Sequence, residues 1–207
     1  MYHLQCSHWL HRSLSSYQIL FFYDAETAAL RMDTPYLAGL LYSRPDDQRV
    51  DERVFEVVSE GRVIGQGELD VYSHPGLMST PRRYRRSDDV YSLGVILLEI
   101  ALWESAAEYC SLDWSPHSIR NNGDDALAIK VVQAAKEELA ADVGELYQHA
   151  VLACLNGLRG PDIEQEIPFN QLHRRPYDGT YQGEDPEYGL ESDLLWKVVR
   201  RLEKLRV

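Results

Sequence analysis

The stretch SDDVYSLGVILLEIALW, residues 87–103, decides the fold. Its opening Ser and Asp residues can accept the unpaired N–H groups of a helix start. Beyond that start it is apolar on nearly every side, and Glu99 is its only charge after Asp89. A helix that is hydrophobic all round belongs inside a protein, and each buried Leu, Ile or Val contributes roughly 1.5–3 kcal/mol. A membrane span needs about 20 predominantly apolar residues, and Glu99, Asp89 and Glu104 argue against one. The stretch therefore predicts a buried central helix over 87–103.

The totals describe a globular protein of one domain, or of one domain with an appendage. The chain has 207 residues, 44% hydrophobic and 26% charged. Its net charge of −12, from 21 basic and 33 acidic side chains, argues against a broad phosphate-binding surface and so against nucleic acid as the main partner. Three widely spaced cysteines make no disulfide framework, and the N-terminus lacks the basic start and apolar run of a signal peptide. We expect a cytoplasmic protein.

Potential metal ligands gather near the N-terminus: His3, Cys6, His8 and His11. A structural zinc site usually takes its ligands from two separated pairs, and no second pair stands at a matching distance. We therefore expect no metal here. The preferred interpretation is a helix end with Leu4, Trp9 and Leu10 facing the core.

The secondary structure of the other segments is predicted from their hydrophobic periodicity and from residues that end helices and strands. Leu20–Tyr23 predicts a short buried strand, and 54–58 with 62–64 predicts a hairpin, with a partly ordered loop as the alternative. Helical spacing predicts a pair of helices within 124–157, the first over 125–140, with a break at Gly144. Residues 159–189 predict a surface excursion. Residues 190–207 predict a C-terminal amphipathic helix whose basic residues suit the helix dipole, with a membrane-surface role as a minor alternative.

The basic run at 82–86, RRYRR, stands just before the central helix. Two interpretations stay open: an anchor for a phosphate or an acidic partner, and a solvated loop that balances local acids. We favour the solvated loop.

Two segments carry a resemblance to a known family. Residues 11–20, HRSLSSYQIL, resemble the protein-kinase catalytic loop H-R-D-L-x-x-x-N followed by two apolar residues. Residues 89–100, DVYSLGVILLEI, resemble the central helix of the kinase C-lobe, and they follow in the family's order. The resemblance implies a mainly α protein-kinase-like C-terminal lobe with short β hairpins and without its N-lobe. It also implies that Asp89 bonds back to the backbone near His11 and Arg12.

The departures from the family fall on its chemistry. Ser13 stands where the resemblance puts the catalytic Asp, Ser15 where the Lys is common, and Gln18 where the Asn holds magnesium. Around Pro35–Leu40 the alignment puts Leu37 at the metal-binding Asp and Gly39 at the Gly of D-F-G. Neutral Ser supplies no general base, and phosphoryl transfer relies on positioned metal ions. Gly76 takes the Glu position of the Y-x-A-P-E element.

On this alignment the chain divides into consecutive parts. They are a degenerate catalytic loop and strand (1–36), an activation-segment equivalent (37–76), the central helix (87–103), the helical pair (124–157), the excursion (159–189) and the C-terminal helix (190–207). The residue sequences of these motifs are similar to those of a fungal kinase-like group. Domains of that group are often joined to HeLo or HET-s-type prion-inhibition domains and are associated with heterokaryon incompatibility and programmed cell death.

The resemblance implies a catalytically inactive domain that acts on a protein partner, with no catalytic residue, cofactor or metal. His11, Arg12, Gly39 and Asp89 would remain as structural residues of the motifs. One alternative is an atypical Ser/Thr kinase, completed by an N-lobe, that uses ATP and magnesium with a carboxylate from elsewhere. Its candidates are Asp24, Asp33, Asp46 and Asp47. A further alternative is an unrelated helical scaffold.

Overall fold

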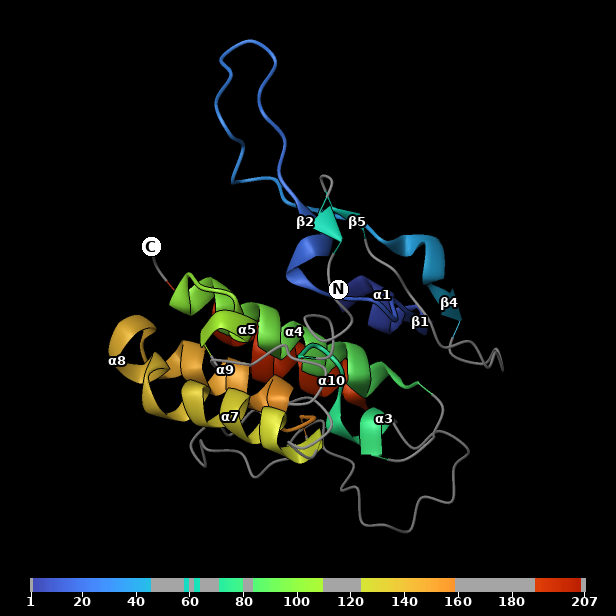
Figure 1. The fold of residues 1–207 in the computed structure, drawn as a ribbon, viewed down its shortest axis with the longest axis vertical. Helices are drawn as coiled ribbons and strands as arrows, with labels where there is room; N and C mark the ends of the chain where they lie inside the picture. The colour runs from blue at the N-terminus through green and yellow to red at the C-terminus, as the bar shows by residue number, and fades with distance from the viewer. Residues whose placement is uncertain are drawn as a thin grey trace.

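The computed structural model describes residues 2–45, 58–59, 62–63, 71–79, 84–109, 124–158 and 189–205. A body of packed helices carries a layer of short strands and turns built mostly from the N-terminal residues (Figure 1). The described part is mainly helical, as predicted, and its strands form short antiparallel pairs.

Helix α4 (Arg86–Leu102) forms the centre of the helical body and confirms the predicted central helix. Most of its side chains are buried, and Val90, Val95 and Leu98 have no exposed surface. The helix begins one residue before the predicted Ser87. Asp88, not Ser87, holds its start by accepting the Arg85 N–H at 2.7 Å, which is half of a capping box.

Helices α4 and α9 (Glu145–Leu155) pack side by side in the core and come close at Gly94. A Cβ placed on Gly94 would lie 2.8 Å from Cys154 Cβ and 3.0 Å from Leu155 Cδ2. Because real Cβ atoms do not come this close, only glycine allows the two helices this spacing at position 94.

The predicted helical pair is present with an extra break. Helix α7 (Asp124–Glu137) ends before the predicted Ala140, and a short helix α8 (Leu139–Val143) follows it. Gly144 separates α8 from α9 with a φ of +87°, a left-handed conformation that favours glycine, so the predicted break there is confirmed.

The C-terminal segment docks on α9 as one helical run. It consists of α10 (Leu190–Leu194), a π-helical turn η4 (Leu195–Val199) and α11 (Arg200–Leu202). Leu194 and Val198 are buried, as the amphipathic pattern predicted, and Leu190 is buried as well. Arg201, one of the basic residues of this segment, is also buried. Its guanidinium donates to the Lys197 carbonyl at 3.1 Å.

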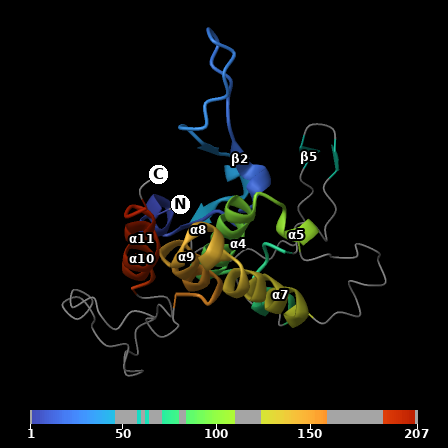
Figure 2. The ribbon, with the colours of Figure 1, turned by 90° about the vertical axis from the view of Figure 1, so that its left-hand side faces the viewer.

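The layer above the helices follows the chain from its start. Its elements are α1 (Tyr2–Cys6), β1 (Trp9–Leu10), the 3-10 turn η1 (Ser16–Gln18), β2 (Ile19–Leu20), β3 (Tyr36–Leu37), the 3-10 turn η2 (Leu40–Tyr42) and β4 (Arg44–Pro45). Strand β1 pairs with β4, and β2 pairs with β3 in the register Ile19 to Leu37. Figures 1 and 2 show the chain between β2 and β3 projecting from the body.

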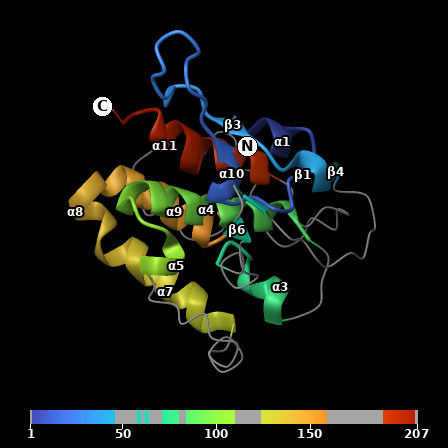
Figure 3. The ribbon, with the colours of Figure 1, turned by 45° about the horizontal axis from the view of Figure 1, so that its top comes forward.

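Shorter elements complete the described fold. Strands β5 (Val58–Ser59) and β6 (Arg62–Val63) pair antiparallel, which confirms that part of the predicted hairpin. Helix α3 (Pro75–Ser79) precedes α4 and α5 (Ala106–Tyr109) follows it (Figure 3). The excursion predicted over 159–189 lies outside the described residues except for Gly189. None of the helices in the described ranges has the length and apolar content that a membrane crossing requires.

Two predictions of burial near the N-terminus are wrong. The segment Leu20–Tyr23 is exposed, with Phe22 at 55% and Tyr23 at 71%, and only Ile19–Leu20 forms a strand. Trp9 is 41% exposed, whereas Leu10 is buried as expected. The physical reason for both is the same: β1 and β2 each belong to a two-stranded pair at the rim of the helical body, so one side of each has no layer above it.

Candidate functional site

Asp89, in the first turn of α4, joins the centre of the fold to the loop after β1. Its Oδ2 accepts the His11 N–H at 2.7 Å, and its Oδ1 accepts the Arg12 N–H at 3.0 Å. The Tyr84 hydroxyl donates to the same Oδ1 at 2.7 Å. The predicted approach of Asp89 to His11 and Arg12 is confirmed, across more than 75 residues of sequence.

The environment of Asp89 has two opposed effects on the pKa of its carboxyl. Complete burial raises the pKa of its carboxyl to about 6, while the hydrogen bonds from Tyr84, His11 and Arg12 act to lower the pKa. Burial and the Asp89 charge together raise the pKa of Tyr84 well above its usual value, so its hydroxyl stays a donor. Near neutral pH Asp89 is therefore a buried carboxylate whose two oxygens are both occupied by donors.

The anchored loop also reaches the segment after β3. The His11 ring is buried, and its Nε2 lies 2.8 Å from the Ala38 carbonyl oxygen. Burial lowers the pKa of His11, so the ring is neutral at physiological pH and its Nε2–H donates to that oxygen. Arg12 adopts a φ of +70° and lays its guanidinium 5.8 Å from the Tyr84 ring centre. The loop is thus held from α4 on one side and from residue 38 on the other.

Gln18, Leu37 and Gly39 are brought together, as the motif alignment requires. Leu37 pairs with Ile19 across the β2–β3 ribbon, and the Ala38 N–H donates to the Gln18 carbonyl at 2.7 Å. A Cβ on Gly39 would lie 2.4 Å from Gln18 Oε1, and Gly39 has a φ of +78°. The Gln18 side chain therefore packs directly on the Gly39 backbone. It occupies the space that the Cβ of any larger residue at position 39 would need.

The two serines of the loop, Ser13 and Ser15, have no described neighbour that could activate their hydroxyl groups. The Ser13 and Ser15 hydroxyl oxygens are buried, and neither has a hydrogen-bond partner among the described residues. A serine acts as a nucleophile only when a neighbouring base takes its proton. The positions of the resemblance thus hold two hydroxyls, one amide and one hydrocarbon side chain, none of which titrates near neutral pH or offers an anionic metal ligand.

The N-terminal His and Cys residues do not form a cluster. His3, Cys6 and His8 are exposed, whereas His11 is fully buried against Ala38. Within the described ranges no three His, Cys, Asp or Glu side chains are grouped so that they could hold a metal ion.

A second buried polar network, which the sequence did not reveal, joins the loop to the last turn of α4. The Tyr72 hydroxyl donates to Glu99 Oε1 at 2.7 Å and lies 2.8 Å from the Ser16 hydroxyl. The Ala106 N–H donates to the same Glu99 oxygen at 2.9 Å. Burial raises the pKa of Glu99, while its donors oppose that effect. The one available signal was Glu99 itself, a lone charge in an apolar helix.

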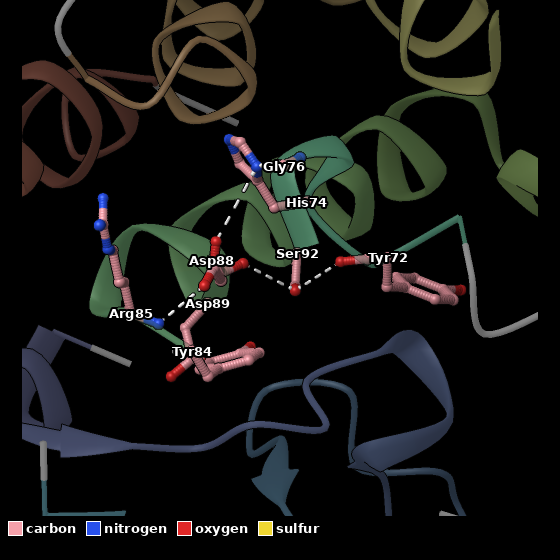
Figure 4. A network of polar contacts seen from close by, with 8 residues as sticks. All are labelled: Tyr72, His74, Gly76, Tyr84, Arg85, Asp88, Asp89 and Ser92. Carbon is pink, nitrogen blue, oxygen red and sulfur yellow. Dashed lines mark hydrogen bonds and ion pairs between the residues drawn. The ribbon is translucent and has the colours of Figure 1, made fainter. Parts of the chain in front are cut away.

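The segment around Gly76 is tied to the same helix by a set of short contacts (Figure 4). The Ser92 hydroxyl lies 2.8 Å from the Tyr72 carbonyl and 3.0 Å from the Asp88 carbonyl. His74 Nδ1 accepts the Gly76 N–H at 3.0 Å and lies 3.9 Å from Asp88 Oδ1. With glycine in place of the family's Glu, these contacts connect residues 72–76 to α4.

In the described part of the basic run at 82–86, Arg86 and Tyr84 are packed into the fold, unlike the solvated loop that the sequence favoured, whereas Arg85 is exposed as that interpretation expects. Arg86 has no exposed surface and forms an ion pair with Glu191 of α10, while Tyr84 bonds to Asp89. Arg82 and Arg83 lie outside the described residues. Arg86 therefore connects the start of α4 to α10, and Tyr84 supports the Asp89 carboxylate.

The acids proposed for an atypical kinase are placed elsewhere or outside the described residues. Asp24 Oδ1 accepts the N–H groups of Glu26 and Thr27 and the Thr27 hydroxyl, so it closes its own turn. Asp33 lies 3.8 Å from Arg31 Nε. Asp46 and Asp47 fall outside the described residues.

Comparison with known proteins places the chain in a family without assigning a role. No curated protein and no solved structure matches it significantly. Residues 1–206 match the family described as a domain of unknown function, DUF7580. The match covers nearly the whole sequence, and the chain therefore belongs to the DUF7580 family.

Proposed function

We propose that this chain is a catalytically inactive protein-kinase-like domain that acts as a regulatory or protein-interaction module. The observation that carries the proposal is the anchoring of His11 and Arg12 by the Asp89 carboxylate. That contact is the one that the resemblance implies. It is accompanied by the grouping of Gln18, Leu37 and Gly39 beside the same loop.

The residues at these positions support the proposed lack of catalysis. A general base contributes typically 10²–10⁴ in rate, and the Ser13 hydroxyl has no partner among the described residues to activate it. Gln18 and Leu37 supply no carboxylate for magnesium, which phosphoryl transfer uses to neutralise developing charge. Shape retained without this chemistry favours a role in binding other proteins. The residue sequences of the motifs suggest that the domain acts in fungal incompatibility or cell-death signalling.

A phosphotransfer assay tests the proposal. The purified chain is incubated with radiolabelled ATP, Mg²⁺ or Mn²⁺ and a general protein substrate, beside the Ser13→Ala and Gln18→Ala variants. We expect incorporation by the wild-type chain to equal that of both variants and of the blank. Incorporation above the blank that either substitution abolishes would show an active enzyme and overturn the proposal.

A further inference from the structure

An apolar hairpin projects from the body between β2 and β3 (Figures 1 and 2). This arm comprises residues 20–36. Its two sides are joined by the bridge between Tyr23 and Leu30 and by the backbone bonds Arg31 N–H to Phe22 O at 3.0 Å and Asp24 N–H to Ala29 O at 2.8 Å. The tip is the turn that Asp24 closes.

The arm concentrates exposed large apolar side chains, each at least about one third exposed: Leu20, Phe21, Phe22, Tyr23, Leu30, Met32 and Tyr36. Phe22 lies edge-on to Tyr36 with ring centres 5.1 Å apart, and Phe21 and Tyr23 add further exposed apolar surface beside them. The four aromatic side chains, about half exposed on average, together present roughly 400 Å². The largest apolar patch on a typical monomer covers about 300–600 Å² and is often functional.

The backbone of the arm leaves room for a partner too. Within the described residues its strands pair only with each other, as a two-stranded ribbon. An isolated two-stranded hairpin is marginally stable in water, and packing against another element supplies the missing stability.

Charge selects the kind of partner. The arm carries Asp24, Glu26 and Asp33 against Arg31, which makes its net charge −2 (one base minus three acids), and the whole chain carries −12. Hydrogen bonds from Thr27 and Glu26 lower the pKa of Asp24, so it stays ionised at physiological pH. A second copy of the chain and an anionic membrane would both bring like charge to the arm.

We propose that the arm is a docking surface for a protein partner whose contact region is apolar at its centre and bears Lys or Arg at its rim. The inference rests on the proposed function, because it names the surface through which an inactive module would act.

Peptide display with the full chain tests the inference. Random peptides displayed on phage are selected on the wild-type chain and counter-selected on Phe21→Ser/Tyr23→Ser, which removes two exposed aromatic rings from the arm. We expect enriched peptides to combine large apolar residues with Lys or Arg. A synthetic peptide of the enriched sequence should lose on the order of tenfold or more in affinity on that variant or on Phe22→Ser/Tyr36→Ser, and should bind more weakly as salt rises.

A matched control removes the same number of exposed apolar groups from another place. Ile100→Ser/Trp103→Ser changes the solvent-facing end of α4, where the two side chains are 51% and 79% exposed, and should leave peptide binding unchanged. Circular dichroism checks that each variant keeps the wild-type fold.

Several results would overturn the inference. Two come from the peptide experiment: enriched peptides without excess basic residues, and equal peptide binding by the arm and control variants. Two others would identify a different occupant: a dimer in light scattering that the arm substitutions dissociate, and sedimentation with phosphatidylserine vesicles that the arm substitutions abolish. Phosphotransfer does not enter these readouts. An active wild-type chain would therefore refute the proposed function alone, and failed peptide selection the arm alone.

Discussion

Both carboxylate oxygens of Asp89 accept hydrogen bonds from groups that can only donate in this geometry, namely the His11 and Arg12 N–H groups. Glu99, ten residues later on the same helix, differs: Tyr72 and Ala106 both donate to its Oε1, and its Oε2 has no partner among the described residues. The same chemical change, carboxylate to amide, should therefore have different consequences at the two positions.

Asp89→Asn should destabilise the fold and release the loop. An asparagine keeps one acceptor oxygen and turns an NH2 group toward at least one backbone N–H, which leaves buried donors unpaired. We expect the free energy of unfolding in urea to fall by about 1–3 kcal/mol. Amide hydrogen exchange at His11 and Arg12 should accelerate. A variant with wild-type stability and protected amides would show that Asp89 does not anchor the loop.

Glu99→Gln should be tolerated and should change the pH dependence of stability. The glutamine oxygen can take the place of Oε1 and accept from Tyr72 and Ala106, while the buried charge disappears. Burial raises the folded-state pKa of Glu99, so the folded protein holds this proton more tightly than the unfolded chain. That contribution is present at low pH and is lost as pH rises through the folded pKa.

Urea unfolding of wild type and Glu99→Gln across the acidic to neutral range measures this effect. The variant should gain stability relative to wild type as pH rises. A constant difference between the two proteins would show that the pKa of Glu99 is the same in the folded and unfolded states.

At the scale of elements, the α4–α9 contact depends on a single missing side chain. Gly94→Ala would place a Cβ 2.8 Å from Cys154 Cβ. Alanine gains up to about 1 kcal/mol of helix propensity over glycine, but overpacking a core contact costs typically about 1–3 kcal/mol. We expect a net loss of stability, measured by thermal or urea unfolding. Ile100→Ala, on the exposed side of the same helix, is the control and should change stability by much less. A stabilised Gly94→Ala protein would mean that the helices are farther apart.

Which elements the sequence could predict depends on how local their signal is. Helix α4, 17 residues long, follows from a stretch that is apolar on nearly every side after Asp89, and the break at Gly144 follows from one residue. The exposure of Leu20–Tyr23 could not be predicted. An apolar sequence does not specify whether another part of the protein packs against it. The burial of Arg86 was also hidden, since its partner Glu191 lies 105 residues away.

At the scale of the whole molecule, the Asp89 contact was predictable only through the order of two motifs. The Ser16–Tyr72–Glu99 network was not, because its members are 56 and 27 residues apart and none belongs to a motif that names the others. On the proposed function, the contacts around Ser13, Gln18 and Leu37 preserve a shape that binds proteins and not nucleotide.

Calorimetric titration of the wild-type chain with Mg·ATP and Mn·ATP, beside Gln18→Ala, measures that claim most directly. We predict heats equal to dilution for both proteins, because no described side chain at 13, 18 or 37 offers a carboxylate to the metal. Saturable binding by the wild-type chain that Gln18→Ala weakens would contradict the account.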